Sequence, residues 1–207
     1  VRSPRRIRGR QVDGARLKDL VLRGDPRVLV AREQRYHNDL FLSVVVDCSG
    51  SMDYGNNLSK AKLFAAMMAE ACRGLDGVEL RLFGFTDTII YDAGDARRPA
   101  VAELHAGGGN NDAAALWHAS EVASQSSRSA KVVVMISDGL PTECSTNALK
   151  ALVARLSRRP DLVCAQVAVQ SLEEVCFPHY IELTEDDTMI SVRRFGAIVA
   201  RLVKGIL

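Results

Sequence analysis

Three oxygen-bearing side chains, Asp47, Ser49 and Ser51, lie at alternate positions of one short stretch and are the residues best suited to chemistry. They follow an apolar run over residues 41–46, which is typical of a strand buried on both faces. We expect this strand to end at Asp47 and the two serines to lie on the loop after it. Hard oxygen donors grouped on one loop suit a small cation such as Mg²⁺. The same residue types form ordinary strand-to-helix turns, so this stretch alone does not decide the question.

Two other segments place polar residues at the end of a strand or the start of a helix. Asn110 and Asp112 follow a glycine run over residues 107–109 and precede an alanine-rich helix. Asp138 follows a second apolar run, residues 131–136. In open α/β sheets, ligands bind at the carboxyl ends of the strands. If the two apolar strands are neighbours at the centre of the sheet, all three loops meet at one point.

The elements that must position these loops alternate along the chain. Apolar and alternating runs predict strands over residues 41–46, 78–85, 88–91, 131–136, 162–169 and 181–183. Helical spacing of apolar residues predicts helices over residues 12–22, 58–72, 113–123 and 189–203. A further helix, capped by Ser145 or Thr146, is predicted to carry Leu149 and Leu156. The strand at 88–91 returns from its predecessor as a hairpin at one sheet edge, and Asn56 and Asn57 are a candidate capping pair for the helix at 58–72. This order is typical of a doubly wound, mostly parallel α/β sheet with helices on both faces and one short antiparallel edge strand.

Composition excludes several classes of protein. The 207 residues are 47% apolar with a net charge of only +2, so the chain can form a core and lacks the overall basic character of a nucleic-acid binder. No apolar run approaches the roughly 20 residues needed to span a bilayer, which argues against a membrane protein. No secretory signal is evident, and Val1 as first residue indicates a piece of a longer chain. Five cysteines without a CxxC pair indicate free thiols in the cytoplasm.

The patterns of common catalytic sites are missing from the sequence. The glycine run at 107–109 lacks the GxxxxGK[ST] pattern of a phosphate loop, and no GxSxG nucleophile elbow occurs. The four histidines show no HExxH spacing for zinc. We therefore expect the chain not to be an enzyme, although it can be a non-catalytic subunit of an ATP-dependent complex.

The start of the chain is basic. Five arginines lie within residues 1–10, which predicts a solvated tail or, alternatively, an arm that docks on an acidic partner. The short helix at 12–22 follows. Residues 27–35 alternate polar and apolar side chains and predict an edge strand that runs into the first core strand.

The Asp-x-Ser-x-Ser stretch, the glycine loop before a helix, and Ile136-Ser137-Asp138-Gly139 after a strand together resemble a von Willebrand factor A (VWA) domain with a metal-ion-dependent adhesion site. This resemblance divides the chain into a basic N-terminal extension, residues 1–26, and a VWA domain, residues 27–207. Residues 110–117 and 133–141 further resemble the C-terminal VWA domain of CobT-type cobaltochelatase subunits.

The resemblance implies a role for each polar residue. Ser49 and Ser51 would bind the metal directly through their hydroxyls, and Asp47 and Asp138 would lie just behind, holding waters or hydroxyls in place. The metal would keep positive charge and an open position, which the carboxylate of an Asp or Glu on a partner protein can fill. Mg²⁺ suits this arrangement, with Mn²⁺ or Ca²⁺ as alternatives.

The third-loop donor departs from the family pattern. The usual residue is threonine, and Asn110 occupies that position here. The carbonyl of Asn110 could replace the threonine, or the carboxylate of Asp112 could reach the metal. Asp112 could equally be the N-cap of the following helix. A direct Asp112 ligand would neutralise more of the metal charge and weaken the grip on an acidic partner.

The resemblance also implies partners. VWA proteins of this kind work beside ring-shaped AAA+ ATPases of the MoxR and chelatase types. We therefore expect a metal-dependent protein-binding module that acts with such an ATPase. The alternative is the VWA subunit of a chelatase complex that inserts cobalt or magnesium into a tetrapyrrole. A nucleic-acid binder that uses its arginine-rich start ranks below both.

Overall fold

The structure is a computed structural model that describes residues 2–6, 11–12, 21–23, 29–32, 39–172, 174–183 and 196–197. The chain separates into two compact units, Val1–His37 and Asn38–Leu207. The predicted helix at 189–203 lies outside the described residues except for residues 196 and 197, which are helical. Most of the predicted helix at 12–22 also lies outside them; residues 21–23 are helical.

The first unit contains a small antiparallel sheet. Its strands are β1 (Arg2–Arg6), β2 (Gln11–Val12) and β3 (Leu29–Arg32), in the order β1-β3-β2. Residues 2–6 therefore form a strand, and the prediction of a tail is wrong for them. The many arginines of this segment indicate a preference for water, but they do not indicate whether the backbone is paired in a sheet. The strand predicted within 27–35 exists as β3, but it pairs with β1 and β2. Its prediction as an edge of the core sheet is wrong, since an alternating pattern does not identify the partner strand.

The second unit is built on a six-stranded sheet with the order β6-β5-β4-β7-β8-β9. The strands are β4 (Leu40–Asp47), β5 (Val78–Phe85), β6 (Ile90–Asp95), β7 (Ala130–Ser137), β8 (Leu162–Ala168) and β9 (His179–Glu182). All neighbours pair in parallel except β5 and β6, which form an antiparallel hairpin at one edge. The predicted mostly parallel sheet with one short antiparallel edge strand is confirmed.

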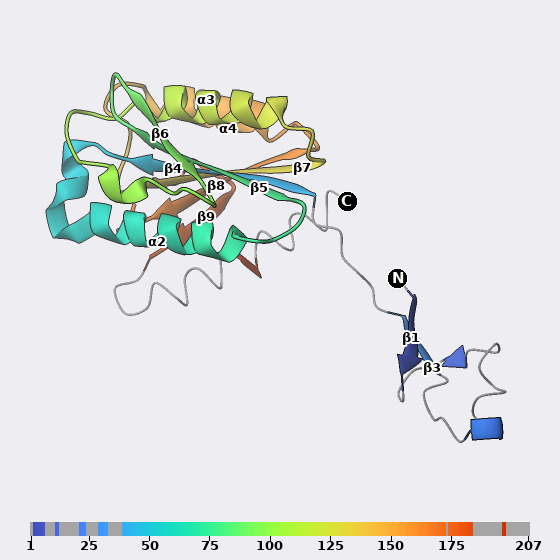
Figure 1. The fold of residues 1–207 in the computed structure, drawn as a ribbon. Coiled ribbons are helices and arrows are strands. Elements are labelled where there is room, and N and C mark those ends of the chain that lie inside the picture. The colour runs from blue at the N-terminus through green and yellow to red at the C-terminus, as the bar shows by residue number, and fades with distance from the viewer. Residues whose placement is uncertain are drawn as a thin grey trace. The chain divides into compact units, whose positions relative to one another are not determined.

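Helices cover both faces of this sheet. The α-helices are α2 (Asn57–Cys72), α3 (Asp112–Gln125) and α4 (Thr146–Leu156), and the 3-10 helices are η2 (Gly50–Asn56) and η3 (Val101–Glu103). Figure 1 shows α3 and α4 on one face and α2 on the other. The doubly wound architecture expected from the sequence is therefore present. Among the described residues, no helix is long and apolar enough to cross a membrane.

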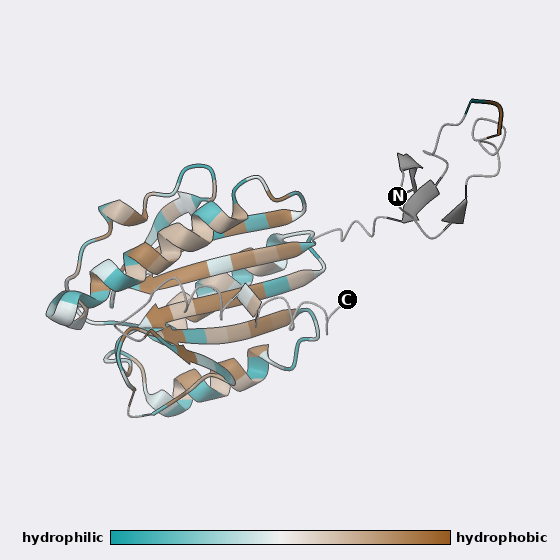
Figure 2. Cartoon of the chain, turned by 90° about the horizontal axis from the view of Figure 1, so that it is seen from below, coloured by the Kyte–Doolittle hydropathy of each residue, from teal (hydrophilic) through white to brown (hydrophobic). Residues whose placement is uncertain are grey.

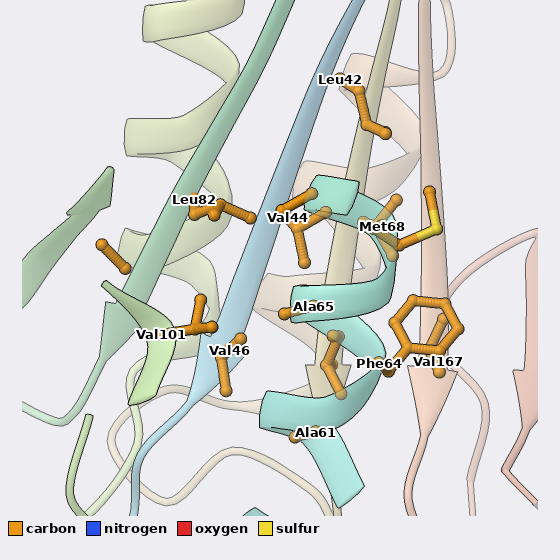
Figure 3. Close-up of a cluster of buried hydrophobic side chains, with 14 of the residues drawn as sticks. Leu42, Val44, Val46, Ala61, Phe64, Ala65, Met68, Leu82, Val101 and Val167 are labelled. Atoms are coloured by element: carbon orange, nitrogen blue, oxygen red, sulfur yellow. The ribbon is translucent and has the colours of Figure 1, made fainter. Parts of the chain in front are cut away.

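The core lies in two layers, one on each face of the sheet. Successive side chains of a strand point to opposite faces, so β4 contributes Leu42, Val44 and Val46 to the layer under α2, and Phe41 and Val45 to the layer under α3 and α4. Figure 3 shows the α2 layer, in which Phe64 and Met68 contact the strands. Because both faces are covered, the central strands are hydrophobic along almost their whole length (Figure 2).

This topology determines where the polar loops lie. The strands β4 and β7 are paired in parallel, with Val46 opposite Ile136. The condition set by the sequence, that these two strands be neighbours at the centre of the sheet, is thus met. Their carboxyl ends coincide, and the loops that begin at Asp47 and Asp138 start side by side.

Candidate metal centre

The first loop holds its polar side chains in a continuous chain of contacts. Asp47 is fully buried at the end of β4, and its Oδ1 accepts a hydrogen bond from the Ser49 amide at 2.7 Å. The hydroxyls of Ser49 and Ser51 are 3.0 Å apart. The Ser51 hydroxyl donates to Oδ1 of Asp138 at 3.0 Å. Two loops 87 residues apart in sequence are thereby joined through the donors that the sequence predicted.

The loop after β7 is held by two residues whose role the sequence did not reveal. Asn57 donates from Nδ2 to Oδ2 of Asp138 and to Oε1 of Gln170, both at 3.3 Å. Gln170 donates in turn to the backbone carbonyl of Asp138. The pattern at residues 56–57 indicated a helix cap, but neither makes the predicted cap: Asn56 is at the N-cap position without a side-chain cap bond, and the amide of Asn57 faces the site.

The glycine loop is joined to the first loop through the backbone. The Gly107 amide donates to the carbonyl of Cys48 at 2.8 Å, and the Gly50 amide donates to the carbonyl of Gly108 at 2.9 Å. Gly108 has a φ of +71°, a conformation that L side chains rarely adopt. These contacts hold the glycine loop that precedes α3 against the loop that follows β4.

Asn110 is buried at 2% exposure, and both the nitrogen and the oxygen of its side-chain amide form hydrogen bonds. Its Nδ2 donates to Oδ2 of Asp47 at 3.2 Å, and its Oδ1 accepts from the Thr142 amide at 2.8 Å. The Thr142 hydroxyl accepts from the Asn110 amide at 2.9 Å. Asn110 therefore connects the loops after β4 and β7, and Thr142 is a further residue that the sequence did not indicate.

Asp112 is the first residue of α3 but does not cap it. The N-cap is Asn111, whose side chain accepts from the Ala114 amide at 3.1 Å. Asp112 is 1% exposed, and in the described part of the structure neither of its carboxyl oxygens has a hydrogen-bond partner. The interpretation of Asp112 as a helix cap is therefore wrong, because the preceding asparagine occupies that role.

Two of the buried carboxyl groups resist ionisation. Burial raises the pKa of Asp47 to about 6, and the charge of Asp138 adds to the rise, while hydrogen bonds from Ser49 and Asn110 oppose it. Burial also raises the pKa of Asp112 to about 7, and the charges of Asp47 and Asp138 add to this effect. Negative charges this close together in a buried place favour either protons or a bound cation.

The residues present fit a hard divalent cation. The fold brings together all six predicted site residues, namely Asp47, Ser49, Ser51, Asn110, Asp112 and Asp138. Within the described ranges, no three His, Cys, Asp or Glu side chains converge closely enough to hold a metal by themselves. Hydroxyls would therefore have to supply ligands, and an all-oxygen set of hydroxyls and carboxyls suits Mg²⁺, Mn²⁺ or Ca²⁺ better than softer metals.

A substitution at Gly109 would test whether the packing between these loops affects metal binding. A Cβ at Gly109 would lie 2.7 Å from Oγ1 of Thr142 and 3.2 Å from Oε1 of Glu143, whereas a Cβ at Gly107 would meet nothing within 4 Å. We expect Gly109→Ala to push Thr142 away from Asn110 and to lower Mg²⁺ affinity by about 10-fold, the loss typical of disturbed supporting residues. Isothermal titration calorimetry should show this loss and no change for Gly107→Ala. Equal affinities for the two variants would contradict the expectation.

Comparison with known proteins identifies the family of this chain. The family model described as "VWA domain containing CoxE-like protein" matches residues 1–180. No curated protein matches the sequence. Among solved structures, a von Willebrand factor type A protein from Catenulispora acidiphila is similar with a TM-score of 0.60 at 17% identity, covering 80% of this chain and 43% of that one. This chain thus spans less than half of that structure.

Two other solved structures share the fold. The manganese-loaded TRAP protein of Plasmodium vivax has a TM-score of 0.58 at 18% identity, covering 78% of this chain and 73% of that chain. The PilB minor pilin of Streptococcus sanguinis has a TM-score of 0.64 at 10% identity, covering 87% of this chain and 66% of that chain. Likeness at such identities shows the fold alone. The family model, in contrast, matches most of the sequence, and the chain therefore belongs to the VWA domain containing CoxE-like proteins.

Proposed function

We propose that this chain is a divalent-metal-dependent protein-binding module. Ser49 and Ser51 would hold Mg²⁺ through their hydroxyls, with Asp47 and Asp138 orienting the surrounding ligands. The observation that carries the proposal is the pair of hydroxyls 3.0 Å apart, bonded on one side to Asp138 and adjacent on the other to the buried Asp47. Binding is the function we propose for this site, since hydroxyls and carboxyls grouped in this way suit a hard cation.

The open side of the site supports binding of a partner protein. Ser51 is exposed, although Ser49 and the carboxylates around it are buried. A cation held here can therefore be reached from solvent through the Ser51 side. Mg²⁺ retains exchangeable positions when proteins bind it, and a carboxylate from an Asp or Glu of the partner is a suitable ligand for one of them.

The partner we propose is an AAA+ ATPase of the MoxR or chelatase type, or a client presented by it. Supporting this choice are the CoxE-like family and the resemblance of residues 110–117 to CobT-type VWA domains. The domain would transmit the motion of the ATPase ring to the client held at its metal. All five cysteines are free thiols, which fits a reducing compartment such as the cytoplasm.

A pull-down with the MoxR-type ATPase from the same genome tests this proposal. We expect the ATPase to be retained in MgCl2 and lost in EDTA. Ser49→Ala should abolish retention, because it removes a metal-binding hydroxyl. The control Ser59→Ala, at an exposed position of α2, should leave retention unchanged. Retention that is indifferent to both EDTA and Ser49→Ala would overturn the metal-dependent mode of binding.

The same experiment separates the chelatase alternative. The retained complex would be supplied with ATP, a tetrapyrrole, and Co²⁺ or Mg²⁺, and metal insertion would be followed by absorbance. Insertion that depends on this chain would assign it to a chelatase complex. An ATPase that binds without any insertion supports a remodelling system of the MoxR type.

A further inference from the structure

We propose that Asp112, and not Asn110, is the third-loop residue that holds the cation. This inference rests on the proposed metal site and assigns the donor that replaces the threonine usual at this loop. The carboxylate of Asp112 would add a third negative charge to those of Asp47 and Asp138 at the cation site.

The side chain of Asn110 already forms hydrogen bonds to two other loops. Its Oδ1 accepts the Thr142 amide at 2.8 Å, and its Nδ2 donates to Asp47 at 3.2 Å. The nitrogen of this amide is the atom that faces Asp47, and Oδ1 faces the Thr142 amide. To present Oδ1 on the side of Asp47, the amide group would have to flip, which would leave the backbone amide of Thr142 without its partner. Such a loss is costly for a buried group. The structure therefore gives Asn110 a positioning role toward Asp47 instead.

Asp112 has the opposite character, because its buried carboxyl group has no hydrogen-bond partner among the described residues. Both carboxyl oxygens lack a hydrogen bond within the described residues, at 1% exposure. A buried carboxylate is costly unless it is paired, hydrogen-bonded or bound to a metal. The capping role that would explain an aspartate at this position belongs to Asn111, which accepts the Ala114 amide. Within the described residues, a proton or a cation can satisfy this acid, and the oxygen donors nearby favour the cation.

Asp112 lies close enough to the two other acids of the proposed site to feel their charges. The charged groups that act on it are Asp47 and Asp138, which flank the serine hydroxyls. The thiols of Cys144 and Cys176 also feel the charge of Asp112, and their pKa values are raised mainly by burial, so these thiols offer Asp112 no countercharge. A divalent cation beside Ser49 and Ser51 would relieve the repulsion among all three carboxylates at once.

The net charge of the cation and its surrounding carboxylates affects partner binding. Three carboxylates around a divalent cation leave a net charge of −1, whereas Asp47 and Asp138 alone would leave the site neutral. Coulomb attraction then favours retention of the cation in the absence of a partner and disfavours an additional carboxylate. We therefore infer a site that holds its metal firmly and takes an acidic side chain only weakly, as suits a contact that must be released in each cycle of an ATPase.

The test compares Asp112→Asn with the cap variant Asn111→Ala in two measurements. The first is Mn²⁺ affinity by isothermal titration calorimetry, and the second is the midpoint of thermal unfolding in EDTA. We expect Asp112→Asn to lower Mn²⁺ affinity by at least about 10-fold and to raise the unfolding midpoint in EDTA, because it removes a buried charge without a partner. Asn111→Ala should leave Mn²⁺ affinity unchanged and lower the midpoint, since only a cap is lost.

The outcomes are distinguishable. Wild-type affinity for Mn²⁺ in Asp112→Asn would overturn the inference and leave the proposed metal site standing. A lowered midpoint in EDTA, like that of Asn111→Ala, would assign Asp112 a structural role and would also overturn it. Failure of the wild-type chain to bind Mn²⁺ would overturn the proposed function itself. Should Asp112→Asn not fold, the same comparison is made with Asp112→Ser, which keeps a small oxygen donor but no charge.

Discussion

Replacing Asp138 with alanine is expected to lower Mg²⁺ affinity by about 100-fold, the upper end of the losses seen when residues that support a metal site are removed. The carboxyl group of Asp138 accepts the Ser51 hydroxyl at 3.0 Å and the Asn57 amide at 3.3 Å. Without it, Ser51 loses the contact that orients its hydroxyl toward Ser49. The site also loses a negative charge that attracts the cation. Orientation and charge are thus lost together.

The measurement is Mg²⁺ binding by isothermal titration calorimetry, with Asp53→Ala as the matched control. Asp53 lies on η2 near the same end of the sheet but is exposed, so its removal should leave affinity close to that of the wild type. Circular dichroism in EDTA would establish that both variants are folded. An Asp138→Ala protein that binds Mg²⁺ within about threefold of the wild type would show that the Ser51–Asp138 contact does not organise the site.

The metal-free domain is expected to be more stable near about pH 5 than near about pH 8, and Mg²⁺ is expected to reverse this order. Burial raises the pKa of Asp47 to about 6 and that of Asp112 to about 7, above the value of 3.8 for an exposed aspartate. Between those values the folded state binds more protons than the unfolded state. The stability that these two protonated aspartates contribute is therefore present at low pH and is lost as the pH rises through about 6 and 7.

The size of this effect follows from the two shifts. Each pKa unit corresponds to about 1.4 kcal/mol, and the two groups interact, so we expect a total change of roughly 3 kcal/mol between the two pH values. Bound Mg²⁺ requires the ionised carboxylates, so its stabilising effect should be greatest above about pH 7 and vanish at about pH 5. The metal and the proton thus compete for the same buried acids.

Thermal unfolding measured across this pH range, in EDTA and in excess MgCl2, tests the prediction. In EDTA the unfolding midpoint should fall as the pH rises, and the fall should be smaller for Asp112→Asn. Acid denaturation ordinarily runs in the other direction, because paired carboxylates have lowered pKa values. A midpoint in EDTA that rises steadily from about pH 5 to pH 8 would therefore contradict the raised pKa values of the two aspartates.

Elements set by local pattern were predicted well from the sequence. The apolar runs at 41–46 and 131–136 form β4 and β7, because strands buried on both faces need apolar side chains at every position. Of the two predicted caps, Ser145 or Thr146, the structure has Ser145 at the start of α4, with its hydroxyl accepting the Ala148 amide at 3.1 Å. The hairpin at the sheet edge also formed, although its second strand is β6 at Ile90–Asp95 and not residues 88–91.

Features that depend on distant partners were not predicted. Strand β3 was assigned to the wrong sheet because its alternation would suit any half-buried strand. Asn57 was interpreted as a helix cap, but its amide reaches Asp138, 81 residues further along the chain. Thr142 and Gln170 gave no signal, since a threonine or glutamine beside a strand end is common in any loop.

The sequence by itself determined that Asp47, Ser49, Ser51 and Asp138 lie at the carboxyl ends of two buried strands, since apolar runs and strand ends are local properties. Only the tertiary structure decided how the third loop is used. The side chain of Asn110 is engaged by Thr142 and by Asp47, 32 and 63 residues away, which no local pattern encodes. In the part of the chain that the structure describes, the carboxyl oxygens of Asp112 have no hydrogen-bond partner. The availability of a donor depends on which hydrogen bonds it already makes, and those are known only once the loops have been brought together.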